Sequence, residues 1–472
     1  MTLEILVQEV AKLRKENREL REKLRLLEAD NRQLRARNKE LERRLQLSSS
    51  TSSKPPSSDG LRAKPRNKSL REKSECASGG QKGHKGNTLM QVLNPDKTVS
   101  LQLSSCPECA TLLKNTPIKA YAKRQVVDIP PVQSIVTEYQ AEIKKCPCCK
   151  KNVTAAFPEH VKAPVQYGRR IQAFVVYLQN QQLLPEKRLQ MLCKDLFNLP
   201  ISAATITKIV ETFSKKLAPH LRDIDIFLRG SPVKHVDETG FRIKGKTRWL
   251  HVLCNNFATL YRASLKRGDI LEDLEKVVVH DHFSSYKKMT HAIHAFCNAH
   301  HLRELKALIE IDKEIWAKKM WDLLRLASKL KKLFGGSLPK KIADRQSVLY
   351  DRYIAQGFQY HESMPLLPRK TGTRRIKRRP GHNLLLRLQK EKEGTLRFFH
   401  EEFVPFTNNQ AEQDIRMMKV KQKISGGFRT MQGAQIFSGI RSFLSTVRKQ
   451  GYDILESITS VIHGRMKLTL VA

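Results

Sequence analysis

Two aspartates stand where short apolar segments of the chain end. Asp237 follows the run Ser231-Pro-Val-Lys-His-Val, and Asp281 lies just beyond the β-branched run 277–279. The segments 247–254 and 259–261 between them also have the composition of strands, so both acids are expected at neighbouring strand ends. Carboxylates are the ligands that magnesium and manganese prefer, and two such ions stabilise the attacking and leaving oxygens of phosphoryl transfer. The pattern therefore favours a metal-dependent phosphoryl-transfer site.

The strand order implied by this stretch is that of a ribonuclease-H-like sheet, and such a site needs a third acid. Spacing leaves two candidates open. Glu304 lies in the helix expected after a strand near 292–297, whereas Glu412 comes much later, beyond a stretch with helical periodicity. In a helix starting near Asn408, Glu412 shares one face with three basic residues, a face that suits metal and phosphate together but is also typical of a solvated, salt-bridged helix. The basic residues are Arg416, Lys419 and Lys423.

Four cysteines form two short pairs, Cys106-Pro-Glu-Cys109 and Cys146-Pro-Cys-Cys149. Two such pairs match the tetrahedral demand of zinc, and four thiolates leave no open position, so a structural zinc module is expected. Strand-like segments at 124–128 and 134–139 are expected between the pairs. Cys148 competes for the fourth ligand position, and buried cysteines without metal are the alternative.

The charge of the chain predicts a polyanionic partner. Lys and Arg number 87 against 46 acids, which gives a net charge of +41 over 472 residues. Phosphate would offset that self-repulsion, so nucleic acid is the expected partner. No apolar stretch of spanning length and no signal peptide is evident, which argues against a membrane and favours a cytoplasmic, nucleoid-associated protein.

The amino-terminal segment has the heptad repeat of a parallel coiled coil. Leucine recurs every seven residues from Leu6 to Leu41, and asparagines occupy three of the intervening a positions. In a parallel dimer each g residue meets an e residue of opposite charge, as Glu9 meets Arg14. Residues 1–47 are therefore predicted to join two copies of the chain, with a single solvated helix as the alternative. The Ser-, Pro- and Gly-rich stretch 48–90 is expected to be a basic flexible linker.

Two further segments are candidates for DNA contact. A helix starting at Pro185-Glu186, a break at Asn198-Leu-Pro200 and a second helix capped by Ser202 outline a helix-turn-helix, although an ordinary helical pair fits equally well. Its second helix would present Thr205, Thr207 and Lys208 outward, a layout that suits the major groove of DNA. A basic loop follows later in the chain and suits either phosphate binding or a tether. Its candidate residues are Arg374, Arg375, Lys377, Arg378 and Arg379.

Several further motifs make the chain resemble the IS66 family of bacterial insertion-sequence transposases nearly end to end. The resemblance is carried by the linker run 53–60, the Gly-Gly-Gln-Lys-Gly-His-Lys-Gly run from 79, the cysteine pairs, His235-Val-Asp-Glu-Thr-Gly240, Val279-His-Asp281, Cys297-Asn-Ala-His300 with Arg303-Glu-Leu305, Asn408-Asn-Gln-Ala-Glu412 with Arg416, Ser425-Gly-Gly-Phe-Arg429 and Arg441-Ser-Phe. The family's catalytic core is a DDE nuclease of the ribonuclease-H-like fold.

The resemblance implies that Asp237, Asp281 and Glu412 form the catalytic triad and bind two magnesium or manganese ions. It also implies that the four paired cysteines bind zinc. Cys297 and His300 match a family signature after the fifth core strand, but packing or a hydrogen bond beside the cleft is the favoured interpretation, and no catalytic role is assigned to them. Two departures from the expected pattern are His282, which could alter metal preference, and Gly427 in place of cysteine.

The sequence thus predicts a multidomain α/β protein. The expected units are a coiled coil (1–47), a linker (48–90), a zinc-binding module (91–160), a helix-turn-helix region (161–228), a core in two parts (229–301 and 401–445) around a helical insertion (302–400), and a C-terminal helical segment (446–472). The expected function is a transposase that nicks element ends and transfers the 3′-hydroxyl strand to target DNA. Its partners would be terminal inverted repeats, target DNA, a second copy and accessory proteins of the same element. A catalytically silent DNA-binding regulator and a nuclease without strand transfer are the alternatives.

Overall fold

A mixed five-stranded sheet forms the centre of the computed structural model, which describes residues 3–48, 51, 83, 89–129, 133–269, 273–365, 367 and 378–472. Its strands are β3 (Val233–Ile243), β4 (Lys246–Cys254), β5 (Thr259–Ser264), β6 (Lys276–His280) and β7 (Ala292–Phe296). The spatial order is β5-β4-β3-β6-β7.

The strands β3, β4 and β5 form the expected antiparallel meander, and β6 and β7 continue the sheet in parallel with β3. Lys244 and Gly245 connect β3 to β4, and both have positive φ (48° and 77°). A two-residue turn with this conformation matches the right-handed twist of the strands it joins. The turn therefore fixes the β3–β4 register, in which Asp237 lies opposite Val252.

Helices cover both faces of the sheet. On one face, apolar residues of β3, β4 and β5 pack against α11 (Asn409–Ser425) and α12 (Met431–Lys449). On the other, Val236, Leu253 and Val278 pack against α5 (Ala218–Gly230). The side chains of β3 alternate between these two cores, as expected for a strand buried on both sides.

The helix-turn-helix outline was predicted correctly in position. The helix α3 (Glu186–Phe197) ends at Asn198 in the left-handed conformation, and α4 (Ala203–Lys216) begins after Ser202, whose hydroxyl accepts the Thr205 amide at 3.1 Å. These helices share one apolar core with α2 (Arg169–Val176), the π-helical segment Tyr177–Gln181, α12 and α13 (Ile454–Ile462). The segments 161–228 and 446–472, expected to be separate, therefore pack together.

The predicted helical stretch between the two parts of the core is helical. Its elements are α6 (Asn298–Ala307), a π-helical segment (Leu308–Asp312), α7 (Ile315–Leu333), α8 (Lys340–Glu362), α9 (Pro380–Lys390), α10 (Lys392–Leu396) and a 3-10 turn (Arg397–Phe399). The periodic residues Leu305, Leu308, Trp316, Leu323 and Leu324 all lie in its buried core. That core also includes Val277 and Val279 of β6, so the helices pack directly on the sheet.

The strands expected between the two cysteine pairs are absent at 124–128 and 134–139, and that prediction was wrong. Val126 and Val136 are 92% and 90% exposed, so neither segment has an apolar surface to pack against. The strands β1 (Ile143–Lys145) and β2 (Asn152–Thr154) instead pair across the second cysteine pair.

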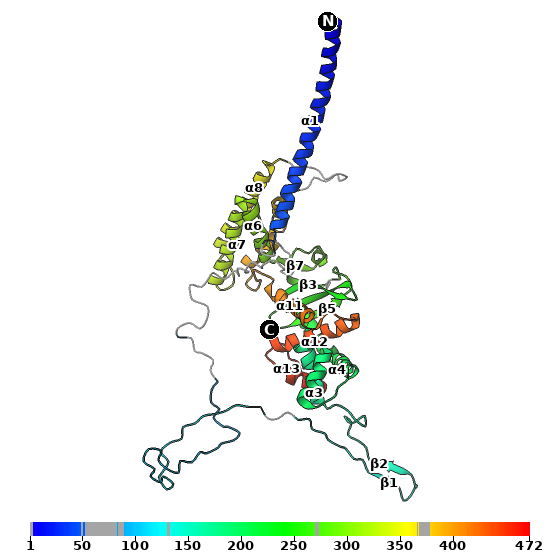
Figure 1. Ribbon diagram of the computed structural model, residues 1–472, viewed down its shortest axis with the longest axis vertical. Helices are drawn as coiled ribbons and strands as arrows, with labels where there is room; N and C mark the ends of the chain where they lie inside the picture. Colours follow the sequence, from blue (N-terminus) through cyan, green and yellow to red (C-terminus); the bar gives the residue numbers. More distant parts are fainter. Residues whose placement is uncertain are drawn as a thin grey trace.

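The amino-terminal helix α1 (Leu3–Gln46) projects away from the body (Figure 1). Its heptad leucines are exposed where they are described, as in Leu13, Leu20 and Leu27. Near its end, Arg43 forms an ion pair with Asp312 at 2.9 Å, and both side chains are largely covered. No described helix is long and apolar enough to cross a bilayer.

Candidate active site

Asp237 and Asp281 lie level with each other on adjacent parallel strands, but the prediction that both acids follow strand ends was wrong for Asp237, because β3 continues past it to Ile243. In the β3–β6 register His235 lies opposite Val279, and continuing that register by two residues pairs Asp237 with Asp281. Asp281 is the first residue after β6, and its Oδ1 accepts the Phe283 amide at 2.8 Å, a short turn that ends the strand there. The sheet itself therefore brings the two carboxylates together.

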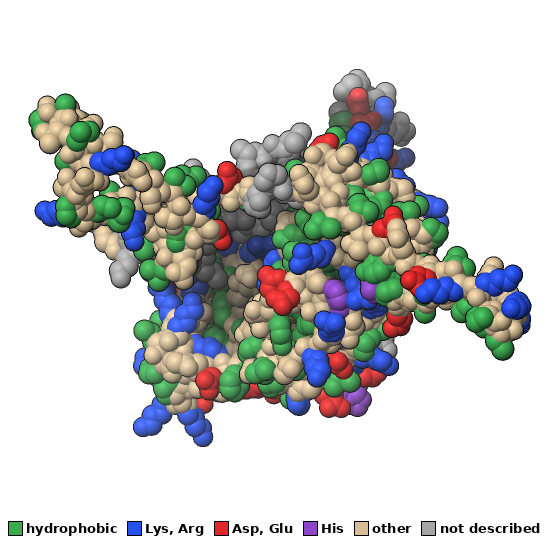
Figure 2. Space-filling view, turned by 90° about the horizontal axis from the view of Figure 1, so that it is seen from below, with side chains coloured by type: hydrophobic (Ala, Val, Ile, Leu, Met, Phe, Trp, Pro, Cys, Tyr) green, Lys and Arg blue, Asp and Glu red, His purple; other side chains and the backbone are tan. Residues whose placement is uncertain are grey.

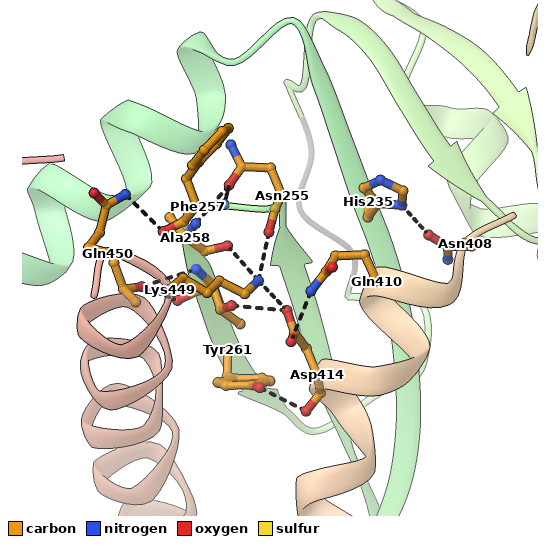
Figure 3. Close-up of polar contacts among 12 residues, drawn as sticks. His235, Asn255, Phe257, Ala258, Tyr261, Asn408, Gln410, Asp414, Lys449 and Gln450 are labelled. Carbon is orange, nitrogen blue, oxygen red and sulfur yellow. Dashed lines mark hydrogen bonds and ion pairs between the residues drawn. The ribbon is translucent and has the colours of Figure 1, made fainter. Parts of the chain in front are cut away.

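Asn408 fixes the start of α11 on the same face of the sheet. Its Nδ2 donates to the Val236 carbonyl of β3, and its Oδ1 lies 2.8 Å from His235 Nδ1, a contact visible in Figure 3. Its backbone amide donates to Cys297 Sγ at 3.1 Å. These three contacts connect β3, the end of β7 and α11 through one buried residue, and Glu412 follows in the first turn of α11.

Asp414 holds α11 from its other side. Its carboxylate accepts hydrogen bonds from Thr259 Oγ1 (3.0 Å) and Lys449 Nζ (2.7 Å), and its backbone carbonyl accepts the Tyr261 hydroxyl (2.8 Å). Figure 3 shows the contacts with Lys449 and Tyr261. Lys449 also donates to the Asn255 and Ala258 carbonyls. The helix that carries Glu412 is thus connected to β5 and α12 by polar contacts as well as by packing.

The electrostatics of this cluster are those of a cation site. Burial raises the pKa of Asp237 well above 3.8, and the neighbouring carboxylates of Glu238, Asp281 and Glu412 raise it further. Burial also raises the pKa of Asp281. The Oε1 atom of Glu412 is buried without a hydrogen-bond partner, and its nearest cation is the Arg303 guanidinium at 3.6 Å. Carboxylate oxygens of this kind fit hard divalent cations, but among the described residues Asp237, Asp281 and Glu412 do not form a group whose ligand atoms all lie within 4.8 Å of one another.

Glu238 was not singled out from the sequence, although it adjoins Asp237 in the quoted motif. Its side chain is 2% exposed and accepts two hydrogen bonds from Arg267 (2.7 and 2.9 Å) and one from the Tyr286 hydroxyl. The Arg267 guanidinium in turn lies over the ring of Phe283, 4.0 Å from its centroid. Burial raises the pKa of Glu238, and the bonds from Tyr286 and Arg267 act against that rise. These contacts hold the loop after Asp281 against β3.

Glu304, the alternative third acid, lies in a different environment. It accepts a hydrogen bond from Arg387 of α9. Glu412 is one of the main charges that raise the pKa of Asp237. Glu304 is not among the main charges that shift the pKa of Asp237 or of Asp281. The arrangement therefore groups Glu412, and not Glu304, with the first aspartate.

The histidine that departs from the family pattern turns into the body of the protein. His282 stacks on Phe296, with ring centroids 4.1 Å apart, and its Nε2 lies 2.6 Å from His301 Nε2. Cys297 is buried, which raises its pKa to about 12, and burial lowers the pKa of His300 to about 3. Cys297 is therefore a neutral thiol, and His300 a neutral imidazole, near neutral pH.

The residues proposed for DNA contact differ in how accessible they are. On α4, Thr207 and Lys208 are exposed, but Thr205 is half-buried and its hydroxyl lies 2.9 Å from Ser202 Oγ in the helix cap. On α11, Arg416, Lys419 and Lys423 are exposed on the Glu412 side, and Lys419 Nζ donates to the Gly240 carbonyl at 2.7 Å.

The basic loop is described only at its end. Arg374, Arg375 and Lys377 lie outside the described residues, while Arg378 is exposed and Arg379 donates to the Pro365 carbonyl at 2.7 Å. On the face seen in Figure 2, Lys and Arg side chains are spread out, with acids among them.

Each cysteine pair adopts the same tight turn. Ala110 and Lys150 both have φ of 55°, and their amides donate to the carbonyls of Cys106 and Cys146, respectively, at 3.0 and 2.9 Å. The Thr111 hydroxyl lowers the pKa of Cys109 to about 7, which favours the thiolate. Each turn thus suits thiolate ligands. In the part of the chain that the structure describes, however, no three of the four paired cysteines gather into a group that could hold an ion.

Three family models match parts of the chain. The family described as "Transposase IS66 family" matches residues 164–436, which span the sheet, α11 and all three carboxylates. The "zinc-finger binding domain of transposase IS66" matches residues 104–150, and a family of unknown function (DUF6444) matches 6–90. No curated protein matches the chain. Because the first of these matches covers more than half of the sequence, the chain belongs to the IS66 family of transposases.

Proposed function

We propose that this transposase nicks the ends of its insertion sequence and joins the freed 3′-hydroxyl strand to target DNA, with Asp237, Asp281 and Glu412 as the catalytic residues. The observation that carries the proposal is the β3–β6 register, which puts the two aspartates level, together with the Asn408 contacts that begin α11 over the same strand. The buried, unpartnered Glu412 Oε1 supports the assignment of the third acid.

The core is proposed to be ribonuclease-H-like, formed by 229–301 and 401–445 around the insertion 302–400. The antiparallel meander followed by two parallel strands supports this assignment. In such a core the first two acids come from the sheet and the third from a helix packed on it, which is the distribution of these three residues.

The three carboxylates would hold two magnesium or manganese ions. Such ions, when bound, supply charge stabilisation for the phosphate and for the attacking and leaving oxygens. The protein's own contribution is to fix the carboxylates before DNA arrives: the sheet fixes two of them, and Asn408 and Asp414 fix the helix that carries the third. Arg416 and Lys423 on that helix would contact phosphate, since both are exposed beside Glu412.

The remaining segments are proposed to hold DNA and a second copy of the chain. The module 91–160 would bind zinc through Cys106, Cys109, Cys146 and Cys149, which requires the two cysteine turns to come together around the ion. With Thr207 and Lys208 of α4, and with Arg378 of the basic loop, it would recognise terminal repeats. The helix α1 would form a parallel coiled coil, so that two ends are held at once, and accessory proteins of the same element would assist.

Cleavage of a labelled element end in magnesium or manganese tests the proposal. Asp237→Asn, Asp281→Asn and Glu412→Gln should each abolish nicking while retaining DNA binding, because each removes one ligand charge. Glu304→Gln is the matched control, since that acid pairs with Arg387.

Nicking that survives Glu412→Gln but is lost in Glu304→Gln would overturn the assignment of the third acid. Binding without any nicking by the wild-type chain would favour the silent regulator. Nicking without joining to a target duplex would favour a simple nuclease.

A further inference from the structure

Three potential metal ligands of unlike chemistry meet beside the proposed catalytic site. Cys297 lies at the junction of β7 and α6, His300 follows in the first turn of α6, and Glu412 comes from α11. One ligand atom from each residue lies within 4.8 Å of the other two. Within the described ranges, no other group of three His, Cys, Asp or Glu side chains meets in this way.

Two polar atoms of this cluster are left without a hydrogen bond. His300 Nδ1 and Glu412 Oε1 are both buried, and neither has a hydrogen-bond partner. Buried polar atoms without partners are rare in folded proteins, and an ion bound between them is one of the causes. Two such atoms on facing elements, with a buried thiol beside them, point to a shared ligand.

Metal binding at His300 Nδ1 requires a change of tautomer of the imidazole. Arg303 Nη2 lies 3.3 Å from His300 Nε2, and a guanidinium can only donate. Nε2 therefore accepts, and the proton of the neutral ring lies on Nδ1. For Nδ1 to bind a cation through its lone pair, this proton must move to Nε2 and the Arg303 guanidinium must turn away from Nε2. The same guanidinium lies 3.6 Å from Glu412 Oε1, so it now supplies the positive charge that a cation would bring.

We propose that Cys297, His300 and Glu412 bind one zinc ion, separate from the magnesium or manganese pair and from the zinc of the paired cysteines. Sulfur and imidazole nitrogen select zinc over magnesium, which prefers oxygen alone. Three protein ligands leave one position of a tetrahedral zinc open, unlike a four-cysteine site. Bond lengths of about 2.0–2.3 Å require the ligand atoms to draw inward by roughly 1 Å.

Sharing Glu412 couples this site to catalysis, a consequence that rests on the proposed function. A carboxylate that binds zinc has less charge to offer a neighbouring magnesium ion. Zinc at this site therefore raises the magnesium concentration needed for half-maximal nicking, and the ion acts as an inhibitor of strand cleavage.

Zinc content of the full-length chain tests the site without reference to activity. After dialysis against limiting free zinc, mass spectrometry should find one zinc fewer per chain in Cys297→Ala and in His300→Ala than in the wild type. Cys193→Ala is the matched control, because Cys193 is a buried thiol in the separate core of α3 and α4. His300→Ala is included because Cys297→Ala also removes the acceptor of the Asn408 amide.

An unchanged zinc count in both variants, with melting temperatures showing that they are folded, would overturn the proposal. The coupling is tested by titrating magnesium with and without zinc: the shift in the midpoint should disappear in His300→Ala, and a shift that persists there would contradict it. If no variant nicks DNA at all, the proposed function fails while the zinc count still decides whether the site exists.

Discussion

Asn408 and His235 face each other across a 2.8 Å hydrogen bond that joins the start of α11 to β3. Both residues are buried, so neither polar group can turn to water if its partner is removed. Together with the bond from Asn408 Nδ2 to the Val236 carbonyl, this contact joins the start of the helix carrying Glu412 to the strand carrying Asp237. The following predictions concern that helix, the proposed metal ligands and the segments outside the core.

Asn408→Ala should lower the free energy of unfolding by about 1–3 kcal/mol, because it leaves buried donors and acceptors unpaired. Nicking should fall further than the loss of folded protein explains, since Glu412 loses its fixed position. Denaturant unfolding and initial nicking rates measure the two effects. Asn409→Ala is the control because Asn409 is exposed; equal effects of the two variants would contradict the positioning role.

Lys449→Met should destabilise the protein by about 2–4 kcal/mol, because it leaves the Asp414 carboxylate uncompensated beneath α11. The two side chains are each only 14% exposed. The matched control is Lys318→Met, which removes an exposed ion pair with Asp322 and should cost about 0.5 kcal/mol or less. Chemical denaturation measures the free energy of unfolding of both variants. Similar losses of stability in the two would show that the Asp414 contact does not anchor the helix.

Without divalent cations, the contribution of Asp237 to stability should decline as pH rises above about 4, because its pKa is higher in the folded protein than in the unfolded chain. The folded state then binds more protons across that window, and losing them costs stability. Asp237→Asn removes this penalty, so in a chelator at pH 7 its melting temperature should exceed that of the wild type. Magnesium should stabilise the wild type more than the variant, and the reverse order would contradict the metal assignment.

Leu27→Glu should convert a dimer into a monomer, because a charge at this d position cannot be buried between two helices. Leu26→Glu is a close control: the two leucines are adjacent and similarly exposed (63% and 62%), but Leu26 lies outside the seam. Sedimentation equilibrium distinguishes the outcomes. A wild-type monomer, or equal loss in both variants, would reject the coiled coil.

Cys149→Ser should release the zinc of the paired cysteines and weaken binding to element ends, whereas Cys148→Ser should do neither. The two residues are neighbours, but only Cys149 has the Cys-x-x-Cys spacing with Cys146. Zinc analysis and end binding by electrophoretic mobility shift measure the result. Zinc loss in Cys148→Ser alone would reassign the fourth ligand.

Much of the catalytic region was predictable because its signals are local. The apolar run 277–279 predicts that a strand ends just before Asp281, and the boundaries of α3 and α4 follow from Asn198, Pro200 and Ser202. A strand end at Asp237 was wrongly predicted, because β3 pairs with β4 well beyond the apolar run, as far as Ile243. The pairing of Asp237 with Glu412 was not predictable from spacing, because it depends on contacts between residues far apart in sequence, such as His235 and Asn408.

Other features were missed or misread for the same reason. Glu238 gave no signal of its own, since its burial depends on Arg267 and Tyr286 reaching it from other elements. The segments around Val126 and Val136 have strand-like composition, but composition cannot create the partner that a strand needs. The packing of α13 against α2 and α4 also had no local signature, because it joins opposite ends of the transposase region.

That packing has a consequence for shortened copies of the gene. Phe213 and Val210 of α4 are buried together with Phe443, Ile458 and Val461 from the end of the chain. A product that stops before α12 would therefore leave the inner face of the α3–α4 helix pair in water. Such a fragment would be expected to aggregate or be degraded, so an interrupted element could not easily leave behind a soluble end-binding competitor of its intact relatives.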